Sequence, residues 1–183
     1  MRIVSGKLKG IRFQPPKSFD SRPTTDFAKE GIFNVLENTY DISSLRILDL
    51  FAGTGSVSFE FASRGAEKVV SVDKNFRCVK FIDEFSRKHN LENLSSLKSD
   101  VFKFIQQHTS QYDLIFADPP FKFQSYDELI TVVLSSGLLS KNGIFILEHE
   151  KRINFDEVAS FDYARKYGNV VFSIFTQQLR SVD

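Results

Sequence analysis

Apolar runs that end in an aspartate alternate along this chain with segments of helical periodicity. Three predicted strands, of which the third (residues 94–99) is mostly polar, end at Asp49, Asp73 and Asp100, and a helical segment follows each of them. Runs of this length are typical of buried parallel strands that are joined by crossover helices. Because the carboxyl ends of parallel strands share one edge of a sheet, the pattern predicts an α/β fold with the three acids at that edge.

Periodicity and helix breakers place the remaining elements. These patterns predict one domain with a mostly parallel, seven-stranded sheet. We expect its last two strands to form an antiparallel hairpin through Gly168-Asn169. Helices are expected near residues 26–37, 55–64, 75–89, 101–108 and 126–136, and strands near 46–48, 69–72, 94–99, 114–117, 144–149 (after a turn at 141–143), 163–167 and 170–176.

A glycine-containing turn, Asp49-Leu50-Phe51-Ala52-Gly53-Thr54-Gly55, follows the first predicted strand. Its two glycines allow close backbone approach, and the helix behind it offers unpaired N–H groups, as in nucleotide-binding turns. A dinucleotide fingerprint would require a third glycine at position 58, where the chain has Ser58. The turn therefore predicts a nucleotide-like ligand and disfavours a dinucleotide.

The three acids suit a ligand that carries ribose, adenine and positive charge. Asp73 lies about 20 residues beyond the glycines, where an acid commonly binds a ribose diol. Asp100 is placed to accept a hydrogen bond from an adenine amino group, although each acid alone could simply cap a helix. Together with Asp49 they favour S-adenosylmethionine, and Lys74 and Val101 complete the predicted cofactor-binding set with residues of the turn.

The four residues Asp118-Pro119-Pro120-Phe121 follow another buried-strand run, residues 114–117. Asp118 and the Pro119 carbonyl can accept the two N–H bonds of an exocyclic amino group, and Phe121 can stack on its ring. Acceptors aimed at both N–H bonds favour the pyramidal nitrogen whose lone pair can attack, and the prolines hold the carbonyls in place. The motif predicts a catalytic site, and the alternative is a stiff turn in which Asp118 only caps.

These motifs, in this order, resemble the cofactor and catalytic motifs of class I methyltransferases. The chain further resembles the RsmD family of bacterial 16S ribosomal RNA guanine-N2 methyltransferases, from residue 1 to about residue 176. The segments that carry this resemblance are Met1–Lys7, Arg22–Asp26, Glu30–Asn34, Glu148–Glu150 and Arg165–Gly168.

The resemblance implies a Rossmann-like class I methyltransferase fold and methyl transfer from S-adenosylmethionine to a guanine N2 in 16S ribosomal RNA. The substrate would be naked RNA or an assembled or assembling small subunit. Arg22, Pro23 and Thr24 are implied to lie beside the cofactor. Phe121 stands where members of this family often carry tyrosine, and stacking is retained.

Other activities remain open from the residues themselves. Guanine, adenine and cytosine all offer an amino group, so an amino-methyltransferase that acts on adenine or cytosine in DNA or another RNA is an alternative. A nicotinamide-dependent oxidoreductase could use the same glycine turn, although Ser58 disfavours it. A non-catalytic RNA-binding module would have no need of the intact Asp118–Phe121 motif.

Basic residues gather in the first 19 positions, which contain no acid, although the net charge of the chain is only +1. We expect residues 1–20 to form a basic β-hairpin arm that contacts phosphates, and residues 21–183 to form the methyltransferase domain. Lysines that protect an exposed hairpin edge are the alternative. The predicted RNA contacts are Arg2, Lys7, Lys9, Arg12, Lys17, Lys29 and Lys122.

The remaining special residues predict no further chemistry. The single cysteine, Cys78, excludes an intrachain disulfide and is expected to be a buried thiol. The three histidines lack metal-ligand spacing, so no metal site is expected. With no signal peptide and no long apolar segment in the sequence, we expect a cytoplasmic monomer that does not contact a membrane.

Overall fold

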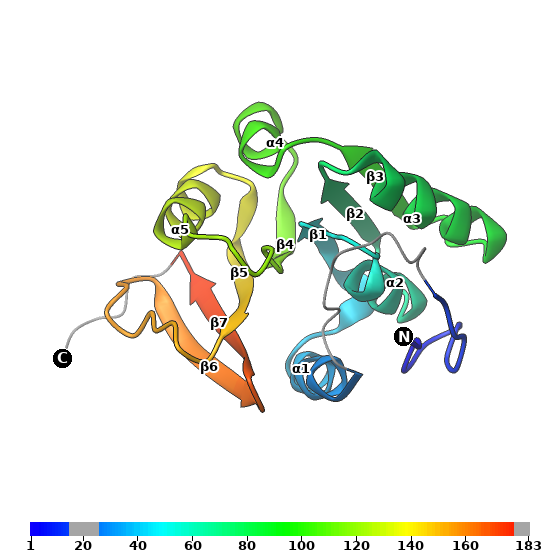
Figure 1. Ribbon diagram of the computed structural model, residues 1–183, viewed down its shortest axis with the longest axis horizontal. Helices are drawn as coiled ribbons and strands as arrows, with labels where there is room; N and C mark the ends of the chain where they lie inside the picture. The colour runs from blue at the N-terminus through cyan, green and yellow to red at the C-terminus, as the bar shows by residue number, and fades with distance from the viewer. Residues whose placement is uncertain (15–25, 178–183) are drawn as a thin grey trace.

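The computed structural model describes residues 1–14 and 26–177, which form a seven-stranded sheet with helices on both faces (Figure 1). The strand order is β3-β2-β1-β4-β5-β7-β6, with β1 to β5 parallel and β7 antiparallel to both of its neighbours. This confirms the predicted mostly parallel sheet and its terminal hairpin. The strands are β1 (Arg46–Leu50), β2 (Lys68–Asp73), β3 (Leu94–Lys98), β4 (Tyr112–Ala117), β5 (Leu139–Glu150), β6 (Phe161–Tyr167) and β7 (Val170–Thr176).

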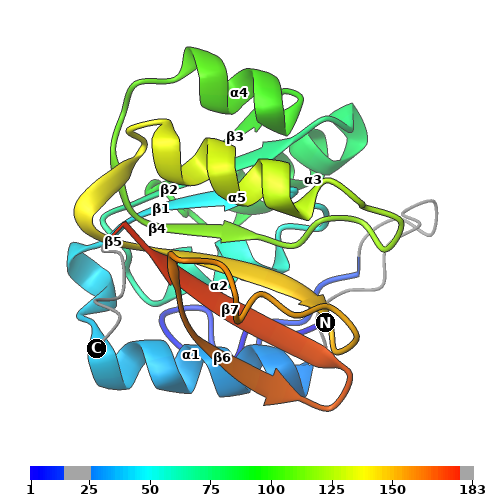
Figure 2. The same ribbon diagram turned by 90° about the vertical axis from the view of Figure 1, so that its left-hand side faces the viewer.

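The helices divide between the two faces of the sheet (Figure 2). One face is covered by α1 (Asp26–Thr39), α2 (Ser56–Ser63) and α3 (Phe76–Lys88), and the other by α4 (Val101–Gln107) and α5 (Tyr126–Ser135). A short 3-10 helix, Ile42–Ser44, leads into β1. Within the described residues, none of these helices is long and apolar enough to cross a membrane.

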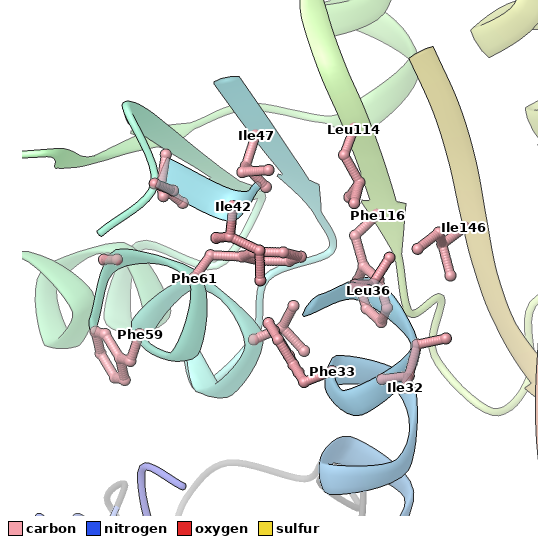
Figure 3. Packing of buried hydrophobic residues seen from close by; sticks show 14 of the residues in the cluster. Ile32, Phe33, Leu36, Ile42, Ile47, Phe59, Phe61, Leu114, Phe116 and Ile146 are labelled. Carbon is pink, nitrogen blue, oxygen red and sulfur yellow. The ribbon is translucent and has the colours of Figure 1, made fainter. Parts of the chain in front are cut away.

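Two apolar layers hold the sheet between the helices, because side chains of successive strand residues point to opposite faces. Ile47 packs toward α1 to α3, whereas its neighbour Leu48 packs toward α4 and α5. Phenylalanines fill much of the first layer, where Phe33 and Phe61 lie 4.5 Å apart between ring centroids (Figure 3). Cys78 of α3 is buried as expected, and burial raises the pKa of its thiol to about 12.

The start of β5 departs from the sequence-based expectation. The turn expected at residues 141–143 lies inside the strand, which begins at Leu139. The pairing shifts from Tyr112↔Leu139 to Leu114↔Ile144, so the extra residues of β5 are accommodated as an irregularity beside β4. The turn predicted at residues 141–143 therefore does not form, because these residues belong to the strand.

The N-terminal segment, residues 1–14, folds back on itself and packs against the rest of the protein. Arg2 and Arg12 form an antiparallel bridge, and the Ile3 N–H donates to the Ile11 carbonyl at 3.0 Å. Ile3 and Phe13 are buried in the first apolar layer, because the segment lies along α2. The Glu60 carboxylate of α2 accepts the backbone N–H groups of Val4 and Ser5, each at 2.9 Å.

The prediction that Lys29 contacts RNA is wrong, because its side chain is completely buried. Its Nζ atom donates to the Arg2 carbonyl at 2.6 Å and to Ser56 Oγ at 3.2 Å, and it lies 3.6 Å from Glu60 Oε2. Burial lowers the pKa of Lys29, and the charge of Glu60 opposes that shift. Lys29 instead ties α1 to α2 and to the N-terminal segment.

β4 and β5 end at different levels on the carboxyl edge of the sheet. Their pairing stops at Ala117↔Leu147, whereas β5 continues to Glu150 and there pairs only with β7. Pro119 and Pro120 follow closely on the β4 side, and proline cannot donate to a strand ladder. As a result, β5 extends past β4 and borders the loop that leaves β4.

Candidate active site

The loop between β1 and α2 has the backbone form of a ligand-binding turn. Gly53 and Gly55 have φ angles of 53° and 75°, and Phe51 shares this left-handed region with φ 59°. A Cβ atom at Gly55 would lie 2.7 Å from Ile82 Cγ1, so both space and conformation require glycine there. A non-glycine residue in this region is a feature that is often found at functional sites.

Asp73, at the end of β2, holds this loop in place. Its Oδ2 accepts the Gly53 N–H at 2.8 Å and its Oδ1 accepts the Asn75 N–H at 2.7 Å. The Ala52 N–H donates to the Val72 carbonyl at 3.0 Å, which adds a second tie between loop and strand. Asp73 therefore holds the glycine turn in shape. This structural role is additional to the predicted contact of Asp73 with a ribose.

Asp49 differs from the expected picture of three acids around a ligand. It is 2 % exposed, and its carboxylate accepts a hydrogen bond from Ser58 Oγ, which also lies 2.6 Å from Ser71 Oγ. Burial raises the pKa of Asp49 to about 7. Ser58, which occupies the position of a third fingerprint glycine, is thus bonded to this acid beneath the loop.

The other predicted cofactor residues lie along the same edge. Asp100 is exposed and accepts the Lys103 N–H at 3.2 Å, so it caps α4 as the simpler alternative proposed. Lys74 is exposed after β2, and Val101 is buried at the first position of α4. Arg22, Pro23 and Thr24, together with Lys17, lie outside the described residues.

The predicted catalytic motif forms a tight loop after β4. The Pro120 carbonyl accepts the Phe123 N–H at 2.7 Å, which turns the chain back toward α5. Phe121 is 66 % exposed at the tip of the turn, whereas Pro119 is buried beside the half-buried Asp118. The loop thus combines an exposed aromatic ring with a carboxylate set back at the sheet edge.

Phe123 joins the catalytic loop to the cofactor loop, a role that the sequence reasoning missed. Its ring lies 5.4 Å from the Phe51 ring and 5.1 Å from the Tyr126 ring, both edge-on. A stacked contact with Phe102 of α4, at 6.4 Å, extends the group. The two loops that were predicted to act together are therefore in physical contact through side chains.

Asp118 lies in a group of acids. Its pKa is raised, first by burial and then by the charges of Glu148 and Asp49. Glu148, on the overhanging end of β5, is 8 % exposed. The sequence reasoning used Glu148 only as part of a resemblance, because nothing in its local pattern shows that β5 runs beside β4.

The basic residues of the N-terminal segment are exposed but engaged with the protein. Arg2 donates to Glu30 at 2.8 Å, and Lys7 donates to the Asn90 carbonyl at 3.0 Å. Lys9 and Arg12 are exposed on the same segment, and Lys122 is exposed beside Phe121. A role of these residues in RNA binding stays a prediction.

A hollow on the opposite, amino edge of the strands is a poor alternative site. Arg46 and Asp113 line it and bond to each other, with Arg46 Nε 3.1 Å from Asp113 Oδ2. The pKa of Arg46 is raised mainly by its hydrogen bond to this carboxylate. Because Arg46 and Asp113 neutralise each other, neither charge is available to bind a ligand in the hollow. Ligands of open α/β sheets also bind at the carboxyl edge and not at the amino edge.

The family model described as Conserved hypothetical protein 95 matches residues 1–176. The chain belongs to this family.

A relative from Bacillus subtilis (strain 168), named putative rRNA methyltransferase YlbH, is 32 % identical over 166 residues, which cover 86 % of each chain. A relative from Haemophilus influenzae, named ribosomal RNA small subunit methyltransferase D, is 32 % identical over 82 % of this chain and 79 % of its own. The resemblance to the RsmD family is confirmed, and the chain is a methyltransferase.

Solved structures agree with this membership. A hypothetical protein of Thermus thermophilus superposes with a TM-score of 0.85 at 27 % identity, over 96 % of this chain and 99 % of that one. The Escherichia coli putative methyltransferase yhhF superposes with a TM-score of 0.84 at 23 % identity, over 97 % and 99 %. The second likeness supports the Rossmann-like methyltransferase fold.

Proposed function

We propose that this protein transfers a methyl group from S-adenosylmethionine to the N2 amino group of a guanine in bacterial 16S ribosomal RNA. The observation that carries the proposal is the contact between Phe51 and Phe123. This contact brings a glycine turn suited to a nucleoside and an Asp-Pro-Pro-Phe loop suited to an amino group together at one sheet edge. The names of the family relatives supply the ribosomal RNA.

The residues at the edge fit S-adenosylmethionine, which supplies an electrophilic methyl group when bound. Gly53 and Gly55 leave no Cβ atom between the backbone and a ligand. Asp73 and Asp100 place negative charge at the edge where a ligand with sulfonium and ammonium groups would bind, while the buried Asp49 supports the loop from beneath. The full proposed cofactor set is Arg22, Pro23, Thr24, Asp49, Phe51, Ala52, Gly53, Thr54, Gly55, Asp73, Lys74, Asp100 and Val101.

Asp118 and the Pro119 carbonyl hold the amino group through its two N–H bonds, and Phe121 stacks on the base. With S-adenosylmethionine bound, the nitrogen would bond to the methyl carbon as the carbon–sulfur bond breaks, and it would then have one proton to lose. Asp118 is suited to receive that proton, because its raised pKa favours the protonated form. Most of the rate enhancement then comes from positioning and from fixed acceptors.

The RNA reaches this edge as an unstacked base, which is easiest in a single-stranded loop. Arg2, Lys7, Lys9 and Arg12 orient it through phosphates on one side, and Lys122 acts beside the catalytic loop. The protein works in the cytoplasm as a monomer, on naked RNA or on an assembling small subunit. Lys29 has no part in this contact.

Nucleoside analysis of modified RNA tests the proposal. Naked 16S RNA and small subunits from a strain that lacks the gene are incubated with the protein and isotope-labelled S-adenosylmethionine. We expect labelled N2-methylguanosine in at least one of the two substrates. Labelled N6-methyladenosine or N4-methylcytidine instead would overturn the assignment to guanine in favour of the alternative amino-methyltransferase.

A further inference from the structure

Two carboxylates from neighbouring strands share one side of the carboxyl edge. Ala117 of β4 pairs with Leu147 of β5, so Asp118 and Glu148 are the next residues on adjacent chains. Adjacent strands lie about 4.8 Å apart. By strand alternation, both positions face the same side as Phe116 and Ile146, which is the side of α1 and α2.

A pair of acceptors complements only one nucleobase that carries an amino group. In guanine, the ring nitrogen N1 next to the C2 amino group carries a hydrogen, so this edge presents two donors side by side. In adenine and cytosine, the ring nitrogen beside the amino-bearing carbon is an acceptor with a lone pair. A carboxylate opposite that lone pair would be repelled, and such repulsion excludes wrong partners.

We infer that Glu148 accepts the N1–H of the target guanine while Asp118 holds its N2 amino group, so that Glu148 determines the choice of base. This inference rests on the proposed function and deepens it. A carboxylate has about four acceptor positions, so contacts of Glu148 within the protein leave capacity for one more hydrogen bond.

The surroundings of the two acids support this role. Glu148 is 8 % exposed on the overhang of β5, where a bound base would complete its burial. The register of β4 and β5 places the two residues side by side, and the charge of Glu148 contributes to the raised pKa of Asp118. Two unprotonated acids so close together are unfavourable without a ligand, and a base with two donors relieves that cost.

The first test needs no variant of the protein. RNA substrates carry either guanine or 2-aminopurine at the methylated position, which nucleoside mapping identifies first. 2-Aminopurine keeps the C2 amino group but has an N1 lone pair in place of N1–H. We expect kcat/KM to fall about 100-fold or more with 2-aminopurine, because the Glu148 carboxylate then faces the N1 lone pair and loses the N1–H hydrogen bond.

The second test changes the acceptor. In Glu148→Gln, the side-chain amide can donate to the N1 of 2-aminopurine, so the ratio of kcat/KM between the two substrates should narrow at least about tenfold. The matched control is Glu150→Gln, the same change two residues further along β5, where Glu150 accepts from Arg152 Nε. The control should keep the wild-type ratio.

A pH profile separates this role from a merely structural one. The titratable groups that interact with Asp118 are Glu148, Asp49 and Tyr126. Loss of the Glu148 charge should move the acid limb of kcat/KM to lower pH, whereas Glu150→Gln should leave it in place. Binding of S-adenosylhomocysteine, measured by calorimetry, shows whether each variant is folded.

The inference fails if the wild-type protein methylates both substrates equally well, or if Glu148→Gln binds S-adenosylhomocysteine normally and keeps the wild-type ratio. Absence of any N2-methylguanosine from the wild-type reaction would instead refute the proposed function. The two failures are therefore distinguishable from the same set of reactions.

Discussion

Burial and the nearby acids Glu148 and Asp49 raise the pKa of Asp118 and so disfavour its charged form. The proposed chemistry nevertheless depends on that charge. Truncation of this side chain to alanine removes the acceptor for the amino group and for the released proton. We expect Asp118→Ala to reduce kcat at least about 100-fold, as for loss of a positioned acid–base group. Calorimetric binding of S-adenosylhomocysteine should stay within a few-fold, because the proposed partner of Asp118 is the base and not the cofactor.

The control for this variant is Asp127→Ala, which removes an exposed carboxylate from the first turn of α5. Its turnover should match that of the wild-type protein. If Asp118→Ala retained wild-type turnover, Asp118 would have to be removed from the mechanism.

The pH dependence of catalysis follows from the same residue. Asp118 accepts N–H bonds only when it is ionised, and burial, Glu148 and Asp49 all raise its pKa. We therefore expect kcat/KM to fall as the pH drops through this raised pKa, so that activity is lost at a higher pH than for an ordinary aspartate. Initial rates measured between about pH 5 and pH 9 at constant ionic strength would check this, and a flat profile would contradict it.

At the residue scale, the sequence predicted positions more reliably at strand ends than elsewhere. The positions of Asp73, Asp100 and Asp118 follow from local patterns, because a strand end can be read from a short apolar run. Lys29 was assigned wrongly because its burial depends on Glu60, which is far away in the sequence. Partners of this kind are set by the tertiary packing, and no local pattern encodes them.

At the scale of elements, the N-terminal segment depends on Glu60 of α2. This buried carboxylate accepts the Val4 and Ser5 N–H groups and pairs with Lys29 and Arg64. Glu60→Gln leaves two buried cations with reduced compensation, so we expect a loss of about 3–5 kcal/mol in the free energy of unfolding. Urea denaturation would measure it.

Glu84→Gln is the control for that experiment, because Glu84 lies on the surface and pairs only loosely with Lys80 at 3.8 Å. It should change the free energy of unfolding by less than about 1 kcal/mol. Equal effects of the two variants would show that the Glu60 network contributes little to stability.

The basic character of the N-terminal segment gives a test of RNA binding. Reversal of two exposed charges, Lys7→Glu with Lys9→Glu, should weaken RNA binding and flatten its dependence on salt, because fewer counterions are released. Cofactor affinity should not change. The control is Lys68→Glu with Lys141→Glu, which makes the same charge change at the amino edge of the sheet. A salt slope that stays at the wild-type value in Lys7→Glu/Lys9→Glu would argue against the segment as an RNA contact.

The sequence predicted all seven strands and the five long helices near their observed places, because glycines, prolines and periodicity mark their ends. It did not predict that β5 begins at Leu139, because that depends on pairing with β4. Nor did it predict that residues 1–14 pack on α2, because the side chains of Ile3 and Phe13 pack in a cluster with residues that are distant in the sequence. Pairing between distant segments is the information that local patterns lack.

For the whole molecule, the acids of the site set a relation between stability and pH. The pKa of Asp49 is raised to about 7 and that of Asp118 is also raised, so the folded protein binds these protons more tightly than the unfolded chain. Their contribution to stability is therefore largest below the ordinary aspartate pKa and is lost as the pH rises through the folded-state values. We expect the melting temperature to fall between about pH 5 and pH 8 for this reason.

Asp118→Asn removes the charge of one of these acids with little change in shape. The variant should melt at a higher temperature than the wild-type protein at pH 8, by roughly 2–4 °C for each kcal/mol gained in the free energy of unfolding. This difference in melting temperature should shrink toward pH 4. Differential scanning calorimetry at the two pH values would show this. A variant that melts below the wild-type protein at pH 8 would mean that the carboxylate is stabilised in the fold after all.

Because β5 extends past β4, the prolines that follow β4 limit how far the two strands can pair. Proline at 119 and 120 denies β5 the amide donors with which a longer β4 would pair along Glu148 to Glu150. Residues with ordinary amides at both positions would permit further rungs of sheet, which would cover the end of β5 beside Asp118. The two pyrrolidine rings thus end the pairing of β4 with β5 at Leu147.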